Sequence, residues 1–350
     1  MGETNLECLS TLRGMARRYS SKKGRNIEPS VQTLTLQFTV PGNSTVNSYI
    51  DLSQIASLVN RRFYRQGINW AVAGFKFLTD GNMIGSVQIQ KLPNTWVMSN
   101  AWTKSFKAWQ RMNNEALAET ESVRPKFLDF KIYADAEHHA AGFAANLLPV
   151  SGTGATANVG EWESSKLVVP LLGGNTGTRE FIATGSNYPG VGASGFDAVS
   201  LIEGYAASRA LPAIEDPNAP TDAADVTGTT PENWLSTIFS EGTNQIDAVV
   251  TDMITENNQA PYPYEGDGAN VDTMYPGGAN QLPGLEGHDL EFISATTIGG
   301  TTRLKGGNFP CGLIKVITGN NTETDKFMTM QIDLIPGSHR GYLCEPMMEM

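Results

Sequence analysis

The chain has 350 residues, of which 17% are charged, with 36 glycines, 18 prolines and a formal net charge of −11. This low-charge, turn-rich composition is typical of short strands joined by ordered loops and argues against a helical bundle. No run of 18 apolar residues occurs, and no basic segment followed by an apolar core opens the chain, so we expect neither a membrane span nor a secretory signal. Cys8, Cys311 and Cys344 form no C-x-x-C pair, which favours free thiols in a reducing compartment.

Residues 1–30 are predicted to form a basic arm. Such a segment buries too little apolar surface to fold alone, and its charge attracts phosphates. The pattern also fits a nuclear-import signal or a solvated tail, and import is compatible with nucleic-acid contact. The expected nucleic-acid-binding residues of the arm fall within thirteen positions that contain no acid: Arg13, Arg17, Arg18, Lys22, Lys23 and Arg25.

Residues 31–170 are expected to form the first part of a β domain. From Val31 to Val40 polar and apolar side chains alternate with a period of two, as they do in a half-buried strand. Similar patterns predict strands over Trp70–Leu78, Ile84–Leu92, Phe127–Tyr133 and Trp162–Pro170.

Two helices are expected between these strands. The first runs from Leu52 to Tyr64 and is ended by Gly67. Its C-terminal end carries three further candidates for nucleic-acid contact, whose alternative role is dipole compensation or an interface ion pair: Arg61, Arg62 and Arg65. The second begins at Ser99 or Asn100 and has an apolar stripe that is expected to pack in a core: Trp102, Phe106, Trp109 and Met112.

From residue 171 to residue 285 the pattern changes, because Gly, Pro, Asn and Thr dominate and acids accumulate. Short helices are expected at 197–209, 231–239 and 245–257. Residues 161–300 carry 20 acidic residues against three basic ones, whereas residues 1–131 carry 17 basic residues against nine acidic ones. We interpret 171–285 as an inserted, loop-rich surface region that projects from the β domain and carries a host-attachment surface.

Residues 286–350 are predicted to supply the last strands and a C-terminal tail. Alternating patterns predict strands over Asp289–Thr297, Gly312–Thr318 and Phe327–Ile335. The turn residues Gly319-Asn320-Asn321-Thr322 are expected to join the last two strands as a hairpin.

Motifs that carry catalysis are absent or weak. The sequence has no G-x-S-x-G elbow, no H-E-x-x-H, no Walker loop and no dinucleotide fingerprint after a strand. His138 and His139 are adjacent, so on a strand they point to opposite faces and are expected to be structural or surface residues. We therefore expect a protein that is not an enzyme and has no catalytic residue, cofactor or metal site.

Together these features predict an all-β fold: a single jelly-roll β-sandwich of two four-stranded antiparallel sheets, with short helices and the inserted region. A closed shell would account for the charge asymmetry, because an inner surface meets phosphates and an outer surface meets water. The basic arm is then expected inside and the acidic loops outside.

Two stretches carry a resemblance to a known family. They are Tyr49-Ile-Asp-Leu-Ser-Gln-Ile-Ala-Ser-Leu-Val-Asn-Arg-Arg-Phe-Tyr-Arg-Gln-Gly, followed by Trp70-Ala-Val-Ala-Gly-Phe, and Ile335-Pro-Gly-Ser-His-Arg-Gly-Tyr. These stretches resemble capsid proteins of small circular Rep-encoding single-stranded DNA viruses of the smacovirus and pecovirus type. The resemblance implies a capsid protein that assembles with itself into an icosahedral shell around a single-stranded DNA genome. It places the protein in the virion and, during assembly, in the host nucleus.

Two other functions fit the same patterns. A coat protein of a small RNA virus shares every feature named above. A glycan-binding jelly-roll lectin or adhesin shares the sandwich and the acidic loops, but it has no need of a basic arm.

Overall fold

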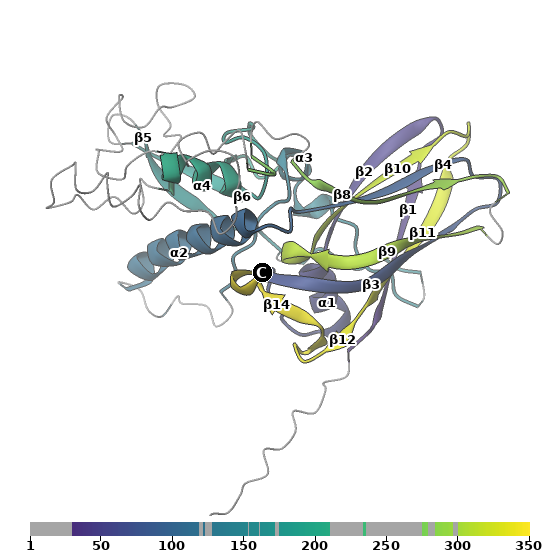
Figure 1. Ribbon diagram of the computed structural model, residues 1–350, viewed down its shortest axis with the longest axis horizontal. Helices are drawn as coiled ribbons and strands as arrows, with labels where there is room; N and C mark the ends of the chain where they lie inside the picture. Colours follow the sequence, from purple (N-terminus) through teal and green to yellow (C-terminus); the bar gives the residue numbers. More distant parts are fainter. Residues whose placement is uncertain are drawn as a thin grey trace, which may run out of the picture.

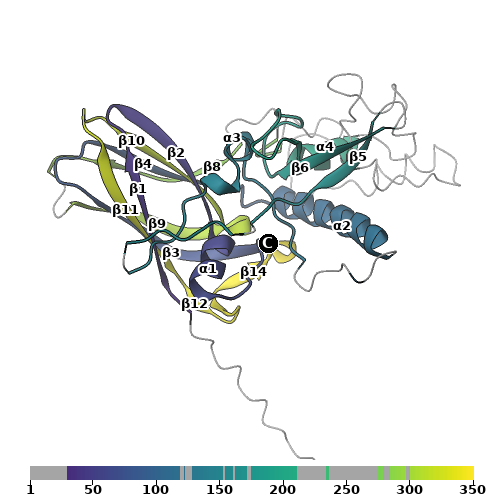
Figure 2. The same ribbon diagram turned by 180° about the vertical axis from the view of Figure 1, so that it is seen from behind.

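The structure is a computed structural model that describes residues 30–118, 122, 128–152, 154–160, 162–171, 175–210, 234–235, 275–278, 284–296 and 300–350. This part of the chain is mostly β-structure, as the composition predicts. Figures 1 and 2 show a two-sheet sandwich beside a second lobe that is built around a long helix.

The first sheet of the sandwich is antiparallel and has five strands. In spatial order these are β1 (Thr33–Val40), β11 (Lys326–Leu334), β3 (Ile68–Thr79) and β9 (Thr301–Phe309), and the short β14 (Cys344–Pro346) pairs with β3 beyond the end of β11. The first and last long strands are therefore neighbours. Thr33 lies opposite Asp333 and donates a hydrogen bond of 2.6 Å from Oγ1 to Asp333 Oδ1.

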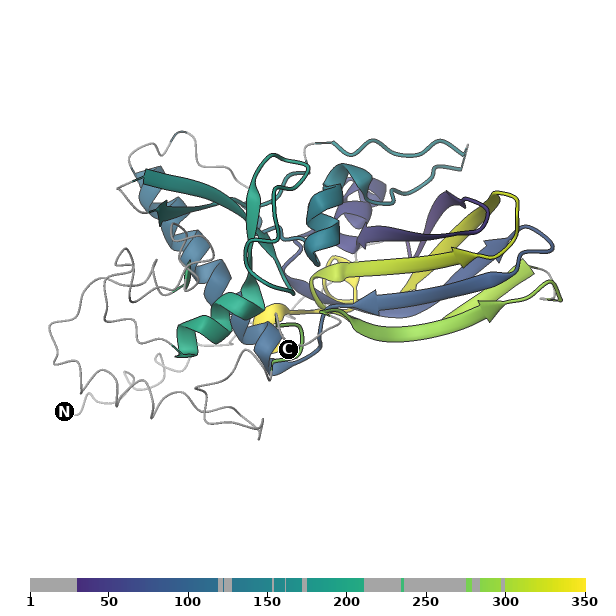
Figure 3. The ribbon, with the colours of Figure 1, turned by 90° about the horizontal axis from the view of Figure 1, so that it is seen from above.

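The second sheet has four antiparallel strands in the order β2 (Ser44–Asp51), β10 (Leu313–Asn320), β4 (Gly85–Lys91) and β8 (Glu286–Ile293). Figure 3 shows both sheets extending away from the second lobe in the same direction. The side chains between the sheets form one apolar core whose central members are fully buried: Leu36, Phe77, Val87, Ile89, Val316, Met330 and Ile332. Burial of this apolar surface is the main force that holds the sheets together.

The period-two patterns locate most of these strands correctly. On β11 the alternate residues Met328, Met330, Ile332 and Leu334 are buried, while the residues between them are at least partly exposed. The strands expected over 31–40, 70–78, 84–92, 312–318 and 327–335 are confirmed within a few residues. The strand expected over 289–297 is shifted, because β8 begins at Glu286 and ends at Ile293.

The hairpin expected between the last two long strands is wrong. β10 pairs with β2 and β4, whereas β11 pairs with β1 and β3, so the chain crosses from one sheet to the other at 321–325. Asn320 fixes this crossing: its Nδ2 donates to the carbonyls of Val40, Pro41 and Thr324 at 3.0–3.1 Å. A hairpin would be held by backbone hydrogen bonds between its two strands. Here the buried amide of Asn320 bonds to the backbone carbonyls at the crossing instead.

Helix α1 (Leu52–Asn60) follows β2 and is shorter than expected. Asp51 caps its first turn, because its carboxylate accepts hydrogen bonds from the backbone N–H groups of Ser53 and Gln54. The helix ends at Arg61, which adopts a left-handed conformation with φ 52° and ψ 39°. Gly67 therefore does not end the helix, and the three arginines lie in the segment after it rather than in its last turn.

The second lobe is built on α2 (Trp96–Ala118), β5 (Leu167–Leu171), β6 (Asn175–Ile182), β7 (Asp197–Ser200) and α4 (Leu201–Ala210). The three strands form a small sheet, antiparallel between β5 and β6 and parallel between β6 and β7. A separate core joins α2 to this sheet, and its buried members include Trp102, Trp109, Phe130, Phe181 and Ile202. None of the helices in the described ranges is long and apolar enough to cross a membrane.

The expected aromatic stripe of α2 does pack in this core, but the helix begins at Trp96 and not at Ser99 or Asn100. The described part of 171–285 contributes β6, β7 and α4, so the lobe draws on residues on both sides of residue 171. Of the other two helices expected there, only residues 234–235 are described, as helix, and 245–257 lie outside the described residues.

The strand expected over Phe127–Tyr133 is not formed in the described residues 128–133. Side chains accept the backbone hydrogen bonds that a neighbouring strand would accept: Ser165 Oγ takes the N–H of Lys131 at 2.9 Å, and Gln66 Oε1 takes that of Ile132 at 2.6 Å. The sequence patterns also missed β2, β6, β9 and the short strands near the C-terminus, and they predicted a helix where β7 (Asp197–Ser200) lies. On β9 only Thr302, Leu304 and Phe309 are buried, so its pattern is too sparse to be recognised.

Candidate nucleic-acid interface

The arm residues Arg13, Arg17, Arg18, Lys22, Lys23 and Arg25 lie outside the described residues, but the point where the arm joins the sandwich is well defined. The N–H of Val31 donates to Asn60 Oδ1 at 3.0 Å, and the hydroxyl of Tyr342 donates to the carbonyl of Val31 at 2.7 Å. Asn60 Nδ2 in turn donates to the hydroxyl of Tyr342 at 2.7 Å. This closed set of hydrogen bonds holds the start of the sandwich beside the C-terminal end of α1.

Arg61, Arg62 and Arg65 follow α1 directly, so the structure places all three close to this junction. The side chains of Arg61 and Arg65 are exposed. Arg65 Nε donates to the carbonyl of Leu128 at 3.3 Å, and its guanidinium lies 5.7 Å from the centre of the Phe63 ring. These two contacts orient Arg65, and its charge also interacts with the nearby carboxylate of Asp129.

Sequence reasoning did not identify two further basic residues, His339 and Arg340, which the fold brings to the same place. They lie between the short strands β12 (Pro336–Gly337) and β13 (Gly341–Tyr342). Arg340 Nη1 donates to the carbonyl of Phe63, and the hydroxyl of Tyr64 donates to the carbonyl of Arg340 at 3.0 Å. Figures 1 and 2 show α1 and β12 next to each other at one end of the sandwich.

His339 and Arg340 belong to the stretch Ile335-Pro-Gly-Ser-His-Arg-Gly-Tyr, so the sequence did contain a pattern that could have drawn attention to them. This stretch lies some 275 positions after α1, and nothing in the sequence indicates that the two segments meet. Packing of the Tyr64, Trp70 and Tyr342 rings, with centroids 5.5–6.0 Å apart, fixes the two segments against each other. We call Arg61, Arg62, Arg65 and Arg340 the basic cluster.

The surroundings of His339 determine where the charge of this region resides. Burial lowers the pKa of His339 below its ordinary value of 6.5, and the nearby charges of Arg340 and Arg65 lower it further. The imidazole is therefore neutral at pH 7, and the positive charge resides on the four guanidinium groups. An exposed group of this kind donates hydrogen bonds to phosphate oxygens and carries no code for base sequence.

A second polar group lies where the sandwich meets the second lobe, around helix α3 (Ala136–Ala141). Lys315 of β10 reaches Asp135 Oδ2 at 3.0 Å and Glu137 Oε2 at 2.7 Å. The hydroxyl of Tyr49 on β2 also donates to Asp135 at 2.8 Å. Burial, together with the charges of Asp135 and Glu137, raises the pKa of this hydroxyl far above 10, so it remains protonated.

Both histidines of α3 are buried, and each makes a contact that explains its place. Nδ1 of His138 accepts from the N–H of Ala134 at 3.1 Å, and its Nε2 lies 2.8 Å from Asn146 Oδ1. His139 Nε2 lies 3.0 Å from Glu180 Oε2 on β6. The two histidines are structural, as expected, although they lie on a helix and not on a strand.

We call the set Tyr49, Lys315, Asp135, Glu137, His138, His139 and Glu180 the junction network. It connects β2 and β10 of the sandwich to β6 of the second lobe through α3. Most of its members find hydrogen-bond or ionic partners within the protein, so the network serves to hold the two regions together. Within the described ranges no group of three or more His, Cys, Asp or Glu side chains is placed to hold a metal ion.

Comparisons of this chain with protein-family models, with curated proteins and with solved structures gave no significant match. A functional assignment therefore depends on the fold, on the basic cluster and on the sequence patterns.

Proposed function

We propose that this protein is a viral capsid protein whose sandwich is a jelly roll and which assembles into a closed icosahedral shell around single-stranded DNA. The observation that carries the proposal is the order of the strands. When the eight long sandwich strands are numbered along the chain, the sheets have the orders 1-8-3-6 and 2-7-4-5. This interleaving supports the assignment as a jelly roll, an architecture found in viral capsids and in lectins.

The connections between the strands support the same assignment. Short segments at 41–43, 80–84 and 321–325 join consecutive strands at one end of the sandwich. The opposite end carries α1, the second lobe and the 3-10 turn η6 (Pro310–Gly312). A wedge with one compact end and one elaborated end can make heterologous contacts that close into a shell of roughly sixty copies or a small multiple.

Charge favours a capsid over a lectin. The basic arm of the sequence precedes Val31, and Val31 donates to Asn60 at the end of α1, close to the basic cluster. The acidic excess lies in residues 161–300, most of which fall within the stretch 171–285. We expect the positive region to face the genome and the acidic region to face solvent and the host.

The assembly part of this proposal is tested with the purified full-length protein. Negative-stain electron microscopy is expected to show uniform closed particles, and light scattering is expected to show an assembly that changes with salt and pH. A monomer that is stable across salt and pH in light scattering would contradict the proposal.

The packaging part is tested by deleting residues 1–26. Because the sandwich lies outside this segment, the deleted protein is expected to assemble but to hold little nucleic acid, measured as the ratio of nucleic-acid to protein absorbance. Digestion of the extracted nucleic acid with DNase or RNase separates a DNA genome from an RNA genome. Particles that retain the full nucleic-acid content after the deletion would exclude the arm as the packaging element.

The contribution of the basic cluster is tested by comparing Arg65→Gln with Lys166→Gln, which removes a partly exposed cation of the second lobe. Each phosphate contact adds about one unit to the slope of log affinity against log salt concentration. We expect Arg65→Gln to reduce that slope by about one and Lys166→Gln to leave it unchanged. Equal slopes in the two variants would remove Arg65 from the interface.

A further inference from the structure

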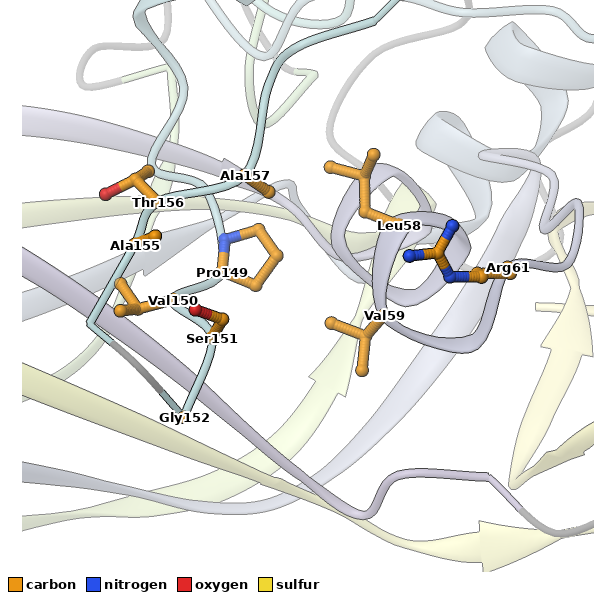
Figure 4. Close-up of a pocket in the computed structure, with 10 residues that line it drawn as sticks. All are labelled: Leu58, Val59, Arg61, Pro149, Val150, Ser151, Gly152, Ala155, Thr156 and Ala157. Carbon is orange, nitrogen blue, oxygen red and sulfur yellow. The ribbon is translucent and has the colours of Figure 1, made fainter.

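A groove opens beside the basic cluster, between the end of α1 and the loop at 149–157. Its cavity volume is about 510 Å³. Figure 4 shows Leu58, Val59 and Arg61 on the helix side, facing the side chains of the loop across the opening. The loop side is formed by small side chains, both aliphatic and polar: Pro149, Val150, Ser151, Gly152, Ala155, Thr156 and Ala157.

The loop that forms this wall is attached to both sheets. The N–H of Leu147 donates to the carbonyl of Tyr49 on β2 at 2.8 Å, and that of Val150 donates to the carbonyl of Thr35 on β1 at 2.9 Å. Val150 and Thr156 then pair as an isolated bridge that folds the loop back on itself. The groove therefore has two walls fixed by backbone hydrogen bonds, which makes it a preformed site.

Arg61 supplies the charge at this groove. Its left-handed backbone conformation, unusual for a residue with a Cβ atom, turns the chain out of the helix and leaves the side chain exposed at the rim. Figure 4 shows the Arg61 side chain at the end of the helix, with its guanidinium directed toward the side of the loop. No hydrogen bond, ion pair or ring contact of this guanidinium occurs among the described residues, so it is available to a ligand.

We propose that this groove binds one unpaired nucleotide of the packaged nucleic acid, with the base between the apolar walls and a flanking phosphate on Arg61. The inference rests on the proposed function and deepens it. A slot that offers aliphatic side chains and a single cation at its rim complements the flat face of a base that is joined to an anionic phosphate. The groove shares Arg61 with the basic cluster.

The site also predicts a preference for single strands. A base that is paired and stacked in a duplex cannot enter a slot on the protein surface without leaving the stack, whereas a base in a single strand can. The basic cluster alone makes no such distinction, because it contacts phosphates that both forms present.

The test uses the full-length protein and two labelled oligonucleotides of equal length in fluorescence anisotropy. One is oligothymidylate, and the other has abasic residues in place of the thymidines, so that only the bases differ. The wild-type protein is expected to bind oligothymidylate about fivefold more tightly, the order expected for burying one face of a base against aliphatic side chains. Arg61→Gln should weaken the binding of both oligonucleotides, since both carry the phosphate.

Ala155→Trp fills the groove from an exposed position and changes no charge. It should bind both oligonucleotides equally, with the affinity that the wild-type protein has for the abasic one. Val191→Trp adds the same ring at a position of the second lobe that is 70% exposed, so it should keep the wild-type preference. Circular dichroism of both variants verifies that they are folded.

A measurement without any substitution gives an independent result. An oligonucleotide with 5-iodouracil, cross-linked by light and mapped by mass spectrometry, is expected to attach within 58–61 or 149–157. Equal affinity of the wild-type protein for both oligonucleotides, or cross-links confined to residues 1–29, would contradict nucleotide binding in the groove. If closed particles still formed and still contained nucleic acid, the proposed function would not be affected. An increase in oligonucleotide affinity after deletion of residues 1–26 would show that the arm occupies the groove instead. Absence of closed particles would contradict the proposed function itself.

Discussion

The sandwich and the second lobe each bury an apolar core, but they are assembled in different ways. In the sandwich the decisive pairs are distant in sequence, since β1 pairs with β11 and β2 pairs with β10. In the second lobe a single long helix supplies an aromatic stripe, and a small sheet and α4 pack against it. Formation of the sandwich core therefore depends on the pairing of strands that are far apart in the sequence. Formation of the core of the second lobe depends on the apolar face of one helix.

The place of the insertion shows why the two regions can coexist. The chain leaves the sandwich after Lys91 of β4 and returns at Glu286 of β8, and these two residues are opposite each other in the second sheet. An insertion whose ends are already adjacent leaves the pairing of the strands undisturbed, and its loop-closure entropy grows only slowly with its length. The junction network then fixes the lobe to the sandwich.

The largest expected effect is the loss of stability when a buried aromatic ring is removed from one of the two cores. Phe77→Ala in the sandwich and Phe181→Ala in the lobe are a matched pair, because both rings are fully buried, and each should lower the free energy of unfolding by about 3–5 kcal/mol. Hydrogen exchange measured by mass spectrometry should show faster exchange throughout the sandwich for Phe77→Ala. For Phe181→Ala, faster exchange should be confined to α2 and β6. Equal loss of protection in β1 and β11 in both variants would show that the regions unfold as one unit.

The next effect concerns the junction network. Lys315→Met leaves Asp135 and Glu137 near each other without their cation, and we expect a loss of about 1–3 kcal/mol in the free energy of unfolding. A double-mutant cycle with Glu137→Gln measured by urea unfolding should show strong coupling between the two positions.

The matched control for this cycle is the pair Lys166–Glu163, whose charged atoms lie 3.8 Å apart and whose side chains are 42% and 80% exposed. Removal of this exposed pair is expected to change stability by less than about 1 kcal/mol. If the two pairs have the same coupling energy, then Lys315 does not hold the junction.

The smallest effect is a dependence of the junction on pH. Burial lowers the pKa of His138 from 6.5 to about 4, and its Nδ1 already accepts a hydrogen bond from Ala134. The stability that depends on the neutral imidazole is therefore complete above pH 6.5 and is lost as the pH falls toward 4, by about 2 kcal/mol at pH 5.

His138→Gln removes this titration, so the difference in unfolding free energy between pH 7.5 and pH 5 should be smaller in the variant than in the wild-type protein. His288→Gln, which changes an imidazole of β8 outside the junction, should keep the wild-type pH dependence. If His138→Gln also kept the wild-type pH dependence, His138 would not be the group whose titration destabilises the protein.

Several features of this protein are determined locally and could be predicted from the sequence. The alternation of β1 and β11 and the aromatic stripe of α2 each place apolar side chains on one face, and a face of that kind has to be buried wherever the element lies. The same local reasoning predicted α1 but carried it too far, because Arg61, Arg62 and Arg65 lie after the helix and not in its last turn.

Other features are decided only by the tertiary structure. Turn residues after β10 look the same for a hairpin and for a crossing between sheets, and the choice depends on which strands are already occupied as partners. The segment 128–133 has the alternation of a strand, but Gln66 and Ser165 take the backbone hydrogen bonds that a strand would need. Arg340 joins the basic cluster, and the loop at 149–157 faces Arg61, because long-range strand pairing brings distant segments together. No local pattern in a sequence encodes which distant segments meet, since that depends on the pairing of the whole chain.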